Sequence, residues 1–292
     1  MGKKLTVYMI DGNNVGPRTI EIGNWSGKAL LSPRSRIAEL INRAEFNRPG
    51  VYILKSDPNE DIYNERIYIG EAENIKNRLK QHLNNEEKDF KEVVFFISKD
   101  ELLTKSHIKY IESKLINLAR EAKNAEIENG NTPTESTLSE ADISDMEYFI
   151  EHIKMILPTA GYQFLISNTI KQTEEKSTNS SNIIKKKYII KNKKYNTVML
   201  DTENGFIVKK DSEANNKLSS SISSGWKKLR EKLIKENVLV LKNDKYVFVE
   251  DTIFTSPSAA SSIVLGRQSA GPNEWIDEQG ITYKENEERS IN

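Results

Sequence analysis

Two tyrosines stand in neighbouring apolar runs and could place their phenol groups in one site. Tyr52 belongs to the run 50–55, and Tyr68 belongs to the run 66–70. Each run also contains a glycine, and a polar stretch separates the two runs. An ordinary hairpin with aromatic strand residues would explain this pattern. The alternative is that both phenols line a functional site.

An arginine and a histidine follow on the next predicted element. Residues 72–84 have the apolar spacing of an amphipathic helix that begins directly after the second tyrosine strand. Asn74, Arg78 and His82 lie four residues apart, so they form one stripe on this helix. We therefore expect the stripe to lie near Tyr68. A guanidinium is planar and permanently charged, so it can hold a phosphate oxygen or stabilise a phosphorane-like transition state.

A glutamate stands at the edge of an apolar helix face further along the chain. Residues 104–123 are expected to form this helix, whose core face carries Ile108, Ile111, Leu115 and Leu118. A carboxylate at position 112 is costly there unless it is paired or bound to a cation. A salt bridge from Glu112 to Lys109 or to an arginine would satisfy it, and so would a metal site. Two phenols, an arginine and a carboxylate could together support metal-assisted hydrolysis of a phosphodiester.

The composition narrows the available chemistry. The 292 residues include no cysteine, which excludes disulfides, thiolate metal sites and cysteine nucleophiles. With only three histidines in the chain, we expect any metal to be a hard cation bound by oxygen ligands. The formal net charge of zero excludes a uniformly cationic surface for nucleic acid but allows local basic patches.

One local basic patch is the stretch 185–194, KKKYIIKNKK, which carries six lysines. A solvated linker face and an arm that contacts phosphates both remain open as interpretations of this stretch. No apolar run approaches the roughly 18 residues that a membrane span requires. We therefore expect a cytoplasmic protein without a membrane partner.

The wider pattern predicts an α+β fold in two domains. Residues 1–166 are expected to form a small antiparallel sheet flanked by helices, with an N-terminal strand–strand–helix extension and a long closing helix. In the extension, Ser32 is expected to cap the helix. The polar residues 167–195 are expected to be a linker, because they offer little to bury. A second, smaller α+β domain is expected at 196–292.

The ordered set of motifs in the first domain resembles the GIY-YIG nuclease family. The residues that carry the resemblance are Gly-Val-Tyr at 50–52, Tyr-Ile-Gly at 68–70, Arg78, His82 and Glu112. The matching region runs from Gly50 to Pro133, less than a third of the chain. Tyr52 and Tyr68 are sixteen residues apart, more than is usual in the family. A register shift in the lengthened loop would turn Tyr52 to the other face of the sheet.

The resemblance implies an endonuclease that hydrolyses phosphodiester bonds in nucleic acid, DNA above all, with one divalent metal, Mg²⁺ or alternatively Mn²⁺. Glu112 would be the metal ligand and Arg78 the phosphate-stabilising residue. Tyr52 and Tyr68 would line the site, with Tyr52 assisting deprotonation of the attacking water. His82 would position that water or share the proton transfer.

The resemblance also implies an asparagine after the glutamate helix. Asn129 is the first choice for this site residue, and Asn131 and Asn124 are the alternatives. Each of them would otherwise be an ordinary turn residue, because the surrounding sequence is a strong turn signal.

The second domain resembles a small carboxy-terminal domain of unknown function that follows this nuclease type in bacterial proteins. Its expected role is target recognition or oligomerisation. Phosphate contacts in the two domains are expected from Arg78, Lys80, Lys227, Lys228 and Arg230. For the three residues of the second domain, a solvated helix face is the simpler explanation.

Three functions remain open at this point. The first is a nuclease acting on double-stranded DNA, with a role in restriction or defence and a homodimer to cut both strands. The second is a nucleic-acid-binding module that has the same fold and no catalysis. The third is a scaffold without affinity for DNA.

Overall fold

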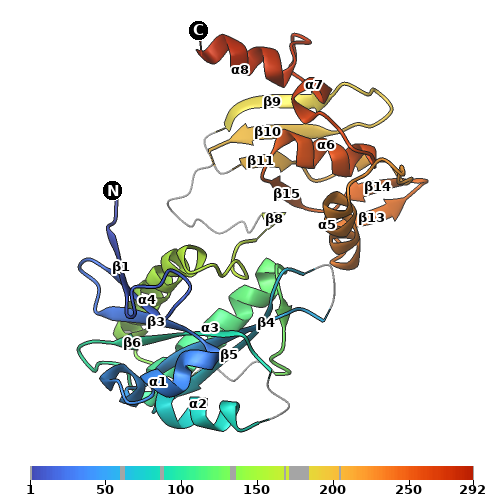
Figure 1. Cartoon of the computed structure of the whole chain (residues 1–292). Helices are drawn as coiled ribbons and strands as arrows, with labels where there is room; N and C mark the ends of the chain where they lie inside the picture. Colours follow the sequence, from blue (N-terminus) through green and yellow to red (C-terminus); the bar gives the residue numbers. More distant parts are fainter. Residues whose placement is uncertain are drawn as a thin grey trace. The chain divides into compact units, whose positions relative to one another are not determined.

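The computed structural model describes residues 2–59, 63–85, 89–131, 136–167, 169–170, 184–203 and 205–291. The chain divides into two compact units, residues 1–166 and 167–292 (Figure 1). No helix in the described part of the chain is both long enough and apolar enough to cross a membrane.

A seven-stranded sheet forms the centre of the first unit. Its strand order is β1–β2–β3–β6–β4–β5–β7, and only the pair β5–β7 is parallel. The strands are β1 (Leu5–Met9), β2 (Arg18–Ile22), β3 (Gly27–Pro33), β4 (Gly50–Ser56), β5 (Arg66–Ala72), β6 (Glu92–Ser98) and β7 (Glu126–Ile127). The predicted α+β fold, with an antiparallel sheet flanked by helices, is confirmed.

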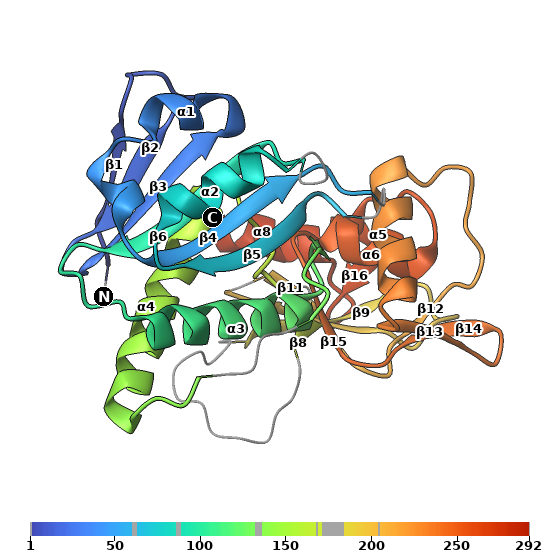
Figure 2. The same ribbon diagram turned by 90° about the horizontal axis from the view of Figure 1, so that it is seen from below.

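Helices cover both faces of this sheet, as Figure 2 shows around β4 and β5. One face carries α1 (Ile37–Leu40), α2 (Ile75–Leu83) and the 3₁₀ segments Arg34–Arg36 and Ala44–Asn47. The other face carries α3 (Lys105–Ala122) and α4 (Glu140–Thr159). Strand side chains alternate between the faces. Consequently Val51 belongs to the core under α3, and its neighbour Tyr52 belongs to the core under α2.

The long loop between β4 and β5 leaves the two tyrosines on the same face. Tyr52 pairs with Gly70 and Leu54 pairs with Tyr68 in the antiparallel register. Cross-strand partners share a face, so both phenols point toward α2. Their ring centroids are 6.2 Å apart. The register shift that the sixteen-residue spacing could have caused does not occur.

The N-terminal extension differs from its prediction after β2. Residues 27–33 form a strand, so Ser32 lies inside β3 and does not cap a helix. The four-residue α1 and two 3₁₀ segments follow in place of a longer helix. β3 pairs with β2 on one side and with β6 on the other. Burial of its apolar run between two strands therefore outweighs the helix-start signal of Ser-Pro.

The second unit contains a six-stranded sheet, ordered β16–β9–β10–β11–β15–β8, and a three-stranded sheet, ordered β12–β14–β13. The strands are β8 (Thr169–Ile170), β9 (Ile184–Ile190), β10 (Val198–Thr202), β11 (Gly205–Val208), β12 (Glu213–Ala214), β13 (Leu239–Lys242), β14 (Lys245–Phe248), β15 (Asp251–Phe254) and β16 (Trp275–Ile276). The helices are α5 (Ser224–Lys235), α6 (Pro257–Leu265), α7 (Gly271–Glu274) and α8 (Tyr283–Ile291). Most of α6 is buried in the core of this unit.

Part of the predicted linker is a strand of the second unit. β9 pairs with β10 and β16, so the assignment of residues 184–190 to a linker is wrong. Tyr188 and Ile190 are buried, whereas Lys187 and the residue between them are exposed. This alternation is the strand signal that the lysine-rich composition hides. Residues 171–183 of the predicted linker lie outside the described residues.

Candidate active site

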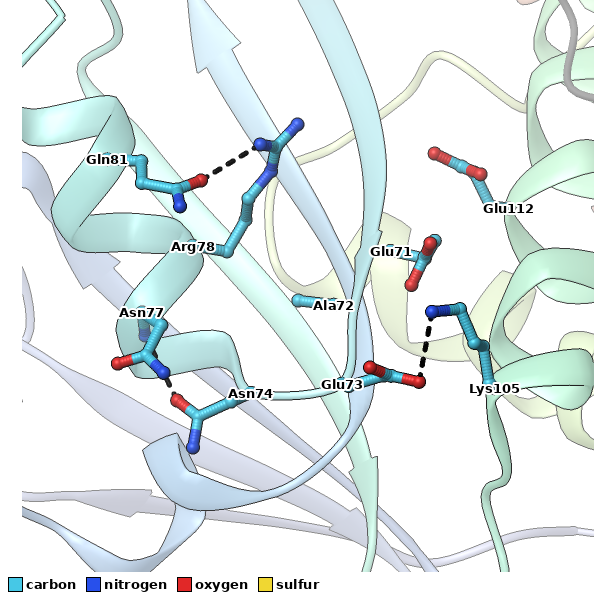
Figure 3. Close-up of a pocket in the computed structure, with 9 residues that line it drawn as sticks. All are labelled: Glu71, Ala72, Glu73, Asn74, Asn77, Arg78, Gln81, Lys105 and Glu112. Atoms are coloured by element: carbon cyan, nitrogen blue, oxygen red, sulfur yellow. Dashed lines mark hydrogen bonds and ion pairs between the residues drawn. The ribbon is translucent and has the colours of Figure 1, made fainter.

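An open cleft of about 470 Å³ lies where α2 and α3 flank the end of β5. The cleft is lined by Glu71, Ala72, Glu73, Asn74, Asn77, Arg78, Gln81, Lys105 and Glu112. Among the described strands, β7 pairs with β5 only at Arg66 and Ile67. In Figure 3, Arg78 reaches in from α2 on one side of β5, and Glu112 lies on the other side. The cleft therefore joins the two faces of the sheet around the open edge of β5.

Tyr52 is fully buried beside this cleft, and two side chains hold its hydroxyl. The hydroxyl lies 2.8 Å from Nε2 of His82 and accepts a hydrogen bond of 3.0 Å from Nε of Arg78. Gly70 stands opposite Tyr52, and a Cβ atom there would lie 2.3 Å from the phenol oxygen. Gly70 is therefore required because the phenol occupies the space of a side chain.

Gly50 and Asn74 help to fix the elements that carry the site: Gly50 affects the position of β4, and Asn74 affects the start of α2. At Gly50, a Cβ atom would lie 2.3 Å from the carbonyl oxygen of Phe96, so glycine allows β4 and β6 to approach closely. At the start of α2, the side chain of Asn74 accepts a 3.0 Å hydrogen bond from the backbone N–H of Asn77. This N-cap fixes the first turn of the helix and with it the position of Arg78.

His82 is buried and lies against both phenol rings. Its ring centroid lies 5.3 Å from that of Tyr52 and 5.7 Å from that of Tyr68. With Nε2 unprotonated, His82 accepts the hydroxyl proton of Tyr52 in their hydrogen bond. Burial raises the pKa of Tyr52 well above its usual range, repulsion from Tyr68 adds to this, and the hydrogen bond from Arg78 opposes it. Tyr52 is therefore a neutral phenol in the free protein.

Glu112 is partly buried on the cleft side of α3. Among the described residues it forms no ion pair, so the alternative of a salt bridge to Lys109 or to an arginine is not realised. Burial raises the pKa of Glu112 to about 7, and the charge of Glu71 adds to the rise. A hydrogen bond from the Glu71 backbone and the charges of Arg78 and Lys109 oppose it. The carboxylate thus lacks a fixed positive partner of its own.

A hard divalent cation fits the donors on this side of the cleft. Glu71 and Glu112 supply carboxylate oxygens, and the open cleft leaves room for the waters that Mg²⁺ retains. A carboxylate that is disfavoured by burial and by a like charge gains most from a bound cation. No three acidic or histidine side chains in the described part of the chain form a metal cluster. Waters and substrate oxygens would therefore complete the coordination.

Asn129 contacts the backbone of β5. Its Oδ1 accepts a 3.0 Å hydrogen bond from the N–H of Ile69, and its Nδ2 donates a 2.8 Å bond to the carbonyl of the same residue. The amide group thus makes the two backbone hydrogen bonds that a neighbouring strand would make. They lie next to the residues of β5 that belong to the site. Asn131 is exposed, and Asn124 donates to a carbonyl of the segment after α4. Asn129 therefore bonds the strand that carries Tyr68.

The predicted nucleic-acid contacts outside the cleft fall into two groups. Lys80 on α2 and both Lys227 and Lys228 on α5 are exposed. Arg230 is only 1 % exposed, and its guanidinium donates to two backbone carbonyls inside the second unit. The prediction that Arg230 contacts phosphates is therefore wrong, because its position on α5 faces the core beside α6, whereas Lys227 and Lys228 are exposed.

Sequence patterns do not single out three polar residues of the cleft: Glu71, Gln81 and Lys105. Gln81 accepts a 3.0 Å hydrogen bond from Nη1 of Arg78, and its i+3 spacing from that arginine is the available signal. Lys105 forms a 3.2 Å ion pair with Glu73. For Glu71, the available signal is its position directly after Gly70, on the face of β5 opposite Tyr68.

The comparisons with known families agree with this geometry. Residues 48–129 match the model of the GIY-YIG catalytic domain, and residues 188–287 match the model of a domain of unknown function, DUF4357. The first match encloses all the site residues from Tyr52 to Asn129. Fold and match together define a nuclease domain of the hydrolase class that acts on nucleic acid. Residues 48–129 are thus similar to GIY-YIG catalytic domains, and residues 188–287 are similar to DUF4357. Searches of curated proteins and of solved structures find no match.

Proposed function

We propose that this protein is an endonuclease that hydrolyses phosphodiester bonds of double-stranded DNA with one divalent cation, Mg²⁺ or in its place Mn²⁺. One observation carries the proposal: Arg78 and Glu112 come from opposite faces of the sheet and line the same open cleft. Phosphodiester hydrolysis requires a cationic group for the phosphate oxygens and a carboxylate for the metal. The two residues supply both.

Arg78 is the proposed phosphate-binding residue. Its guanidinium has five N–H donors, and it uses Nε for Tyr52 and Nη1 for Gln81. These two bonds fix the plane of the guanidinium, so its other donors are oriented before a phosphate arrives. Negative charge on the phosphate oxygens grows in the transition state. Arg78 therefore stabilises the transition state more than the bound substrate.

Tyr52 and His82 are proposed to remove the proton from the attacking water. Because Tyr52 is a neutral phenol, it accepts that proton while it passes its own proton to Nε2 of His82. No free phenolate forms, so the high pKa of Tyr52 does not oppose the step. Nε of Arg78 covers the phenol oxygen in the free protein. The phenol oxygen has a second lone pair, which accepts from the attacking water while Nε of Arg78 stays bonded.

Glu112 is the proposed metal ligand. A divalent cation at this carboxylate supplies Lewis-acid polarisation of a phosphoryl oxygen and neutralises charge on the phosphate. Glu112 binds it in the ionised form, which at its pKa of about 7 is available at neutral pH and above. Asn129 supports the site through its two bonds to the backbone of β5, and Tyr68 borders it.

The DNA partner is proposed from exposed basic side chains: Lys80 near the cleft, and Lys227 and Lys228 on α5. Lysines at these positions would contact phosphates without reading sequence. One metal site cuts one strand at a time, so a homodimer would account for cleavage of both strands. A cytoplasmic role in restriction or defence is consistent with such an activity.

Incubation of supercoiled plasmid with the full-length protein and Mg²⁺ tests the proposal. We expect nicked or linear plasmid from the wild type, and none in the presence of a chelator or with Glu112→Ala. Binding of a fluorescent duplex to the Glu112→Ala protein should persist. Equal products from both proteins would contradict the proposed site. Binding without cleavage by the wild type would indicate a nucleic-acid-binding module instead.

A further inference from the structure

Two carboxylates, Glu71 on β5 and Glu112 on α3, lie at one end of the contact between these two elements. Ile67 and Ile69 on β5 belong to the core under α3, so the next residue on that strand face is Glu71. On α3, Ile108 belongs to the same core, and Glu112 follows one helical turn later. The alternation of the strand and the period of the helix thus bring both acidic side chains to one end of the contact.

The two carboxylates face the same solvent-filled space. Both line the cleft, and Figure 3 shows them together on the α3 side of β5. Two ionised carboxylates that face one space repel each other, and a bound cation would remove this repulsion. Lys105, the lysine that lines the cleft, forms its ion pair with Glu73. Among the described residues, neither Glu71 nor Glu112 has an ion-pair partner.

We propose that Glu71 is the second protein ligand of the divalent cation held at Glu112, an inference that rests on the proposed nuclease function. Mg²⁺ is commonly bound by one or two carboxylates together with waters and substrate phosphate oxygens. Two carboxylates from a strand and a helix would hold the cation at one place relative to the edge of β5. Arg78 approaches the same edge from the other face. Glu71 would therefore help to determine the position of the cation relative to the guanidinium, and so which phosphate oxygens each of them contacts.

Glu73 provides a matched control for this assignment. It is the same residue type, lines the same cleft and lies two residues further along the same backbone. It is exposed, and its carboxylate is already 3.2 Å from the ammonium group of Lys105. A general effect of negative charge on cation affinity would appear equally with Glu71→Gln and Glu73→Gln. A direct ligand would produce an effect with Glu71→Gln alone.

Calorimetric titration of the metal-free, full-length protein with Mn²⁺, without DNA, tests the assignment. We expect Glu71→Gln and Glu112→Gln each to weaken Mn²⁺ binding by about tenfold or more, and Glu73→Gln to change it by less than about twofold. Water-proton relaxation of bound Mn²⁺ should increase in Glu71→Gln, because a water replaces the lost carboxylate. Thermal melting should show that Glu71→Gln is at least as stable as the wild type, since the substitution removes a repulsion.

The outcomes separate this inference from the proposed function. Wild-type affinity and relaxation in Glu71→Gln, together with weak binding by Glu112→Gln, would overturn the role of Glu71 and leave the nuclease proposal intact. Equal weakening by Glu71→Gln and Glu73→Gln would also overturn it. Absence of Mn²⁺ binding by the wild type would contradict the metal site as a whole, including the part of Glu112.

Discussion

The hydroxyl of Tyr52 connects the residue proposed to bind phosphate with the residue proposed to receive a proton. Arg78 and His82 both bond this oxygen from α2, at 3.0 and 2.8 Å. Gly70 leaves the space in which the oxygen lies. Each of the four positions 52, 70, 78 and 82 therefore needs its own residue type for a different reason. Single substitutions can test these reasons one at a time.

Tyr52→Phe removes only the oxygen that joins Arg78 and His82. We expect the first-turnover rate of DNA cleavage to fall about 100-fold or more, because the water loses its proton acceptor. Affinity for DNA should change little, since the guanidinium of Arg78 is retained. Tyr8→Phe, at an exposed tyrosine of β1, is the matched control and should cut at the wild-type rate. Unchanged cleavage by Tyr52→Phe would rule out the proton transfer proposed here.

The raised pKa of Glu112 predicts a pH-dependent stability in the metal-free protein. The usual pKa of 4.5 rises to about 7 on folding, so protonated Glu112 stabilises the native state below about pH 4.5. This contribution is lost as the pH rises through about 7. It amounts to about 1–2 kcal/mol after allowance for solvent screening.

Thermal melting in the presence of a chelator measures this effect. We expect Glu112→Gln to melt a few degrees above the wild type at pH 8 and at nearly the same temperature at pH 5. A constant difference between the two proteins across this pH range would show that Glu112 does not titrate as the structure indicates.

At the scale of elements, the site depends on a strand edge that is left open between two helices. β5 carries Gly70 toward α2 and Glu71 toward α3, so residues adjacent in sequence serve opposite sides of the cleft. Asn129 bonds the backbone just before this point and ends the paired part of the edge. The position of β5 relative to both helices therefore decides the geometry of the site.

Gly70→Ala tests the close contact between β5 and the phenol. The added methyl group would lie 2.3 Å from the oxygen of Tyr52, so the ring or the strand must move. We expect a loss of about 1–3 kcal/mol in the free energy of unfolding, measured by urea denaturation, and a marked loss of cleavage. Gly23→Ala, where a Cβ atom meets nothing within 4 Å, is the control. Equal stability of the two variants would contradict the contact.

The sequence predicts the elements around the site well because each of their signals is local. The strands β4 and β5, α2 with Arg78, and α3 with Glu112 follow from alternation and helical spacing over short windows. The register of β4 and β5 across their long loop does not follow from such windows. β3 is missed because its Ser-Pro end imitates a helix start, and β9 is missed because lysines occupy its exposed positions. The burial of Arg230 and the approach of Glu71 to Glu112 depend on which tertiary neighbours each side chain meets, and no local pattern encodes that.

At the scale of the whole molecule, the two units differ in what they contain. All residues that line the described cleft belong to the first unit, and the second unit has exposed lysines on α5. Lys227 and Lys228 lie on the solvent side of α5, whereas Arg230 on the same helix stabilises the core. Under the proposed function, cleavage would belong to the first unit and part of the DNA affinity to the second.

Replacement of both Lys227 and Lys228 by glutamine should weaken DNA binding about tenfold and reduce the slope of log K against log salt by about 2. The first-turnover rate at saturating protein should not change. Fluorescence anisotropy over a range of salt concentrations measures the first effect. Lys242→Gln, an exposed lysine of β13, is the control. An unchanged slope would show that α5 does not contact DNA phosphates.

The most direct test of the account is the first-turnover rate of DNA cleavage by Arg78→Lys, with DNA affinity measured on the same samples. Lysine keeps the charge but cannot bond Tyr52, Gln81 and a phosphate from one rigid plane. We predict a rate at least about 100-fold below that of the wild type and an affinity within about threefold of it. Cleavage at the wild-type rate, or a loss of rate that disappears at saturating protein, would contradict the proposed site at the edge of β5.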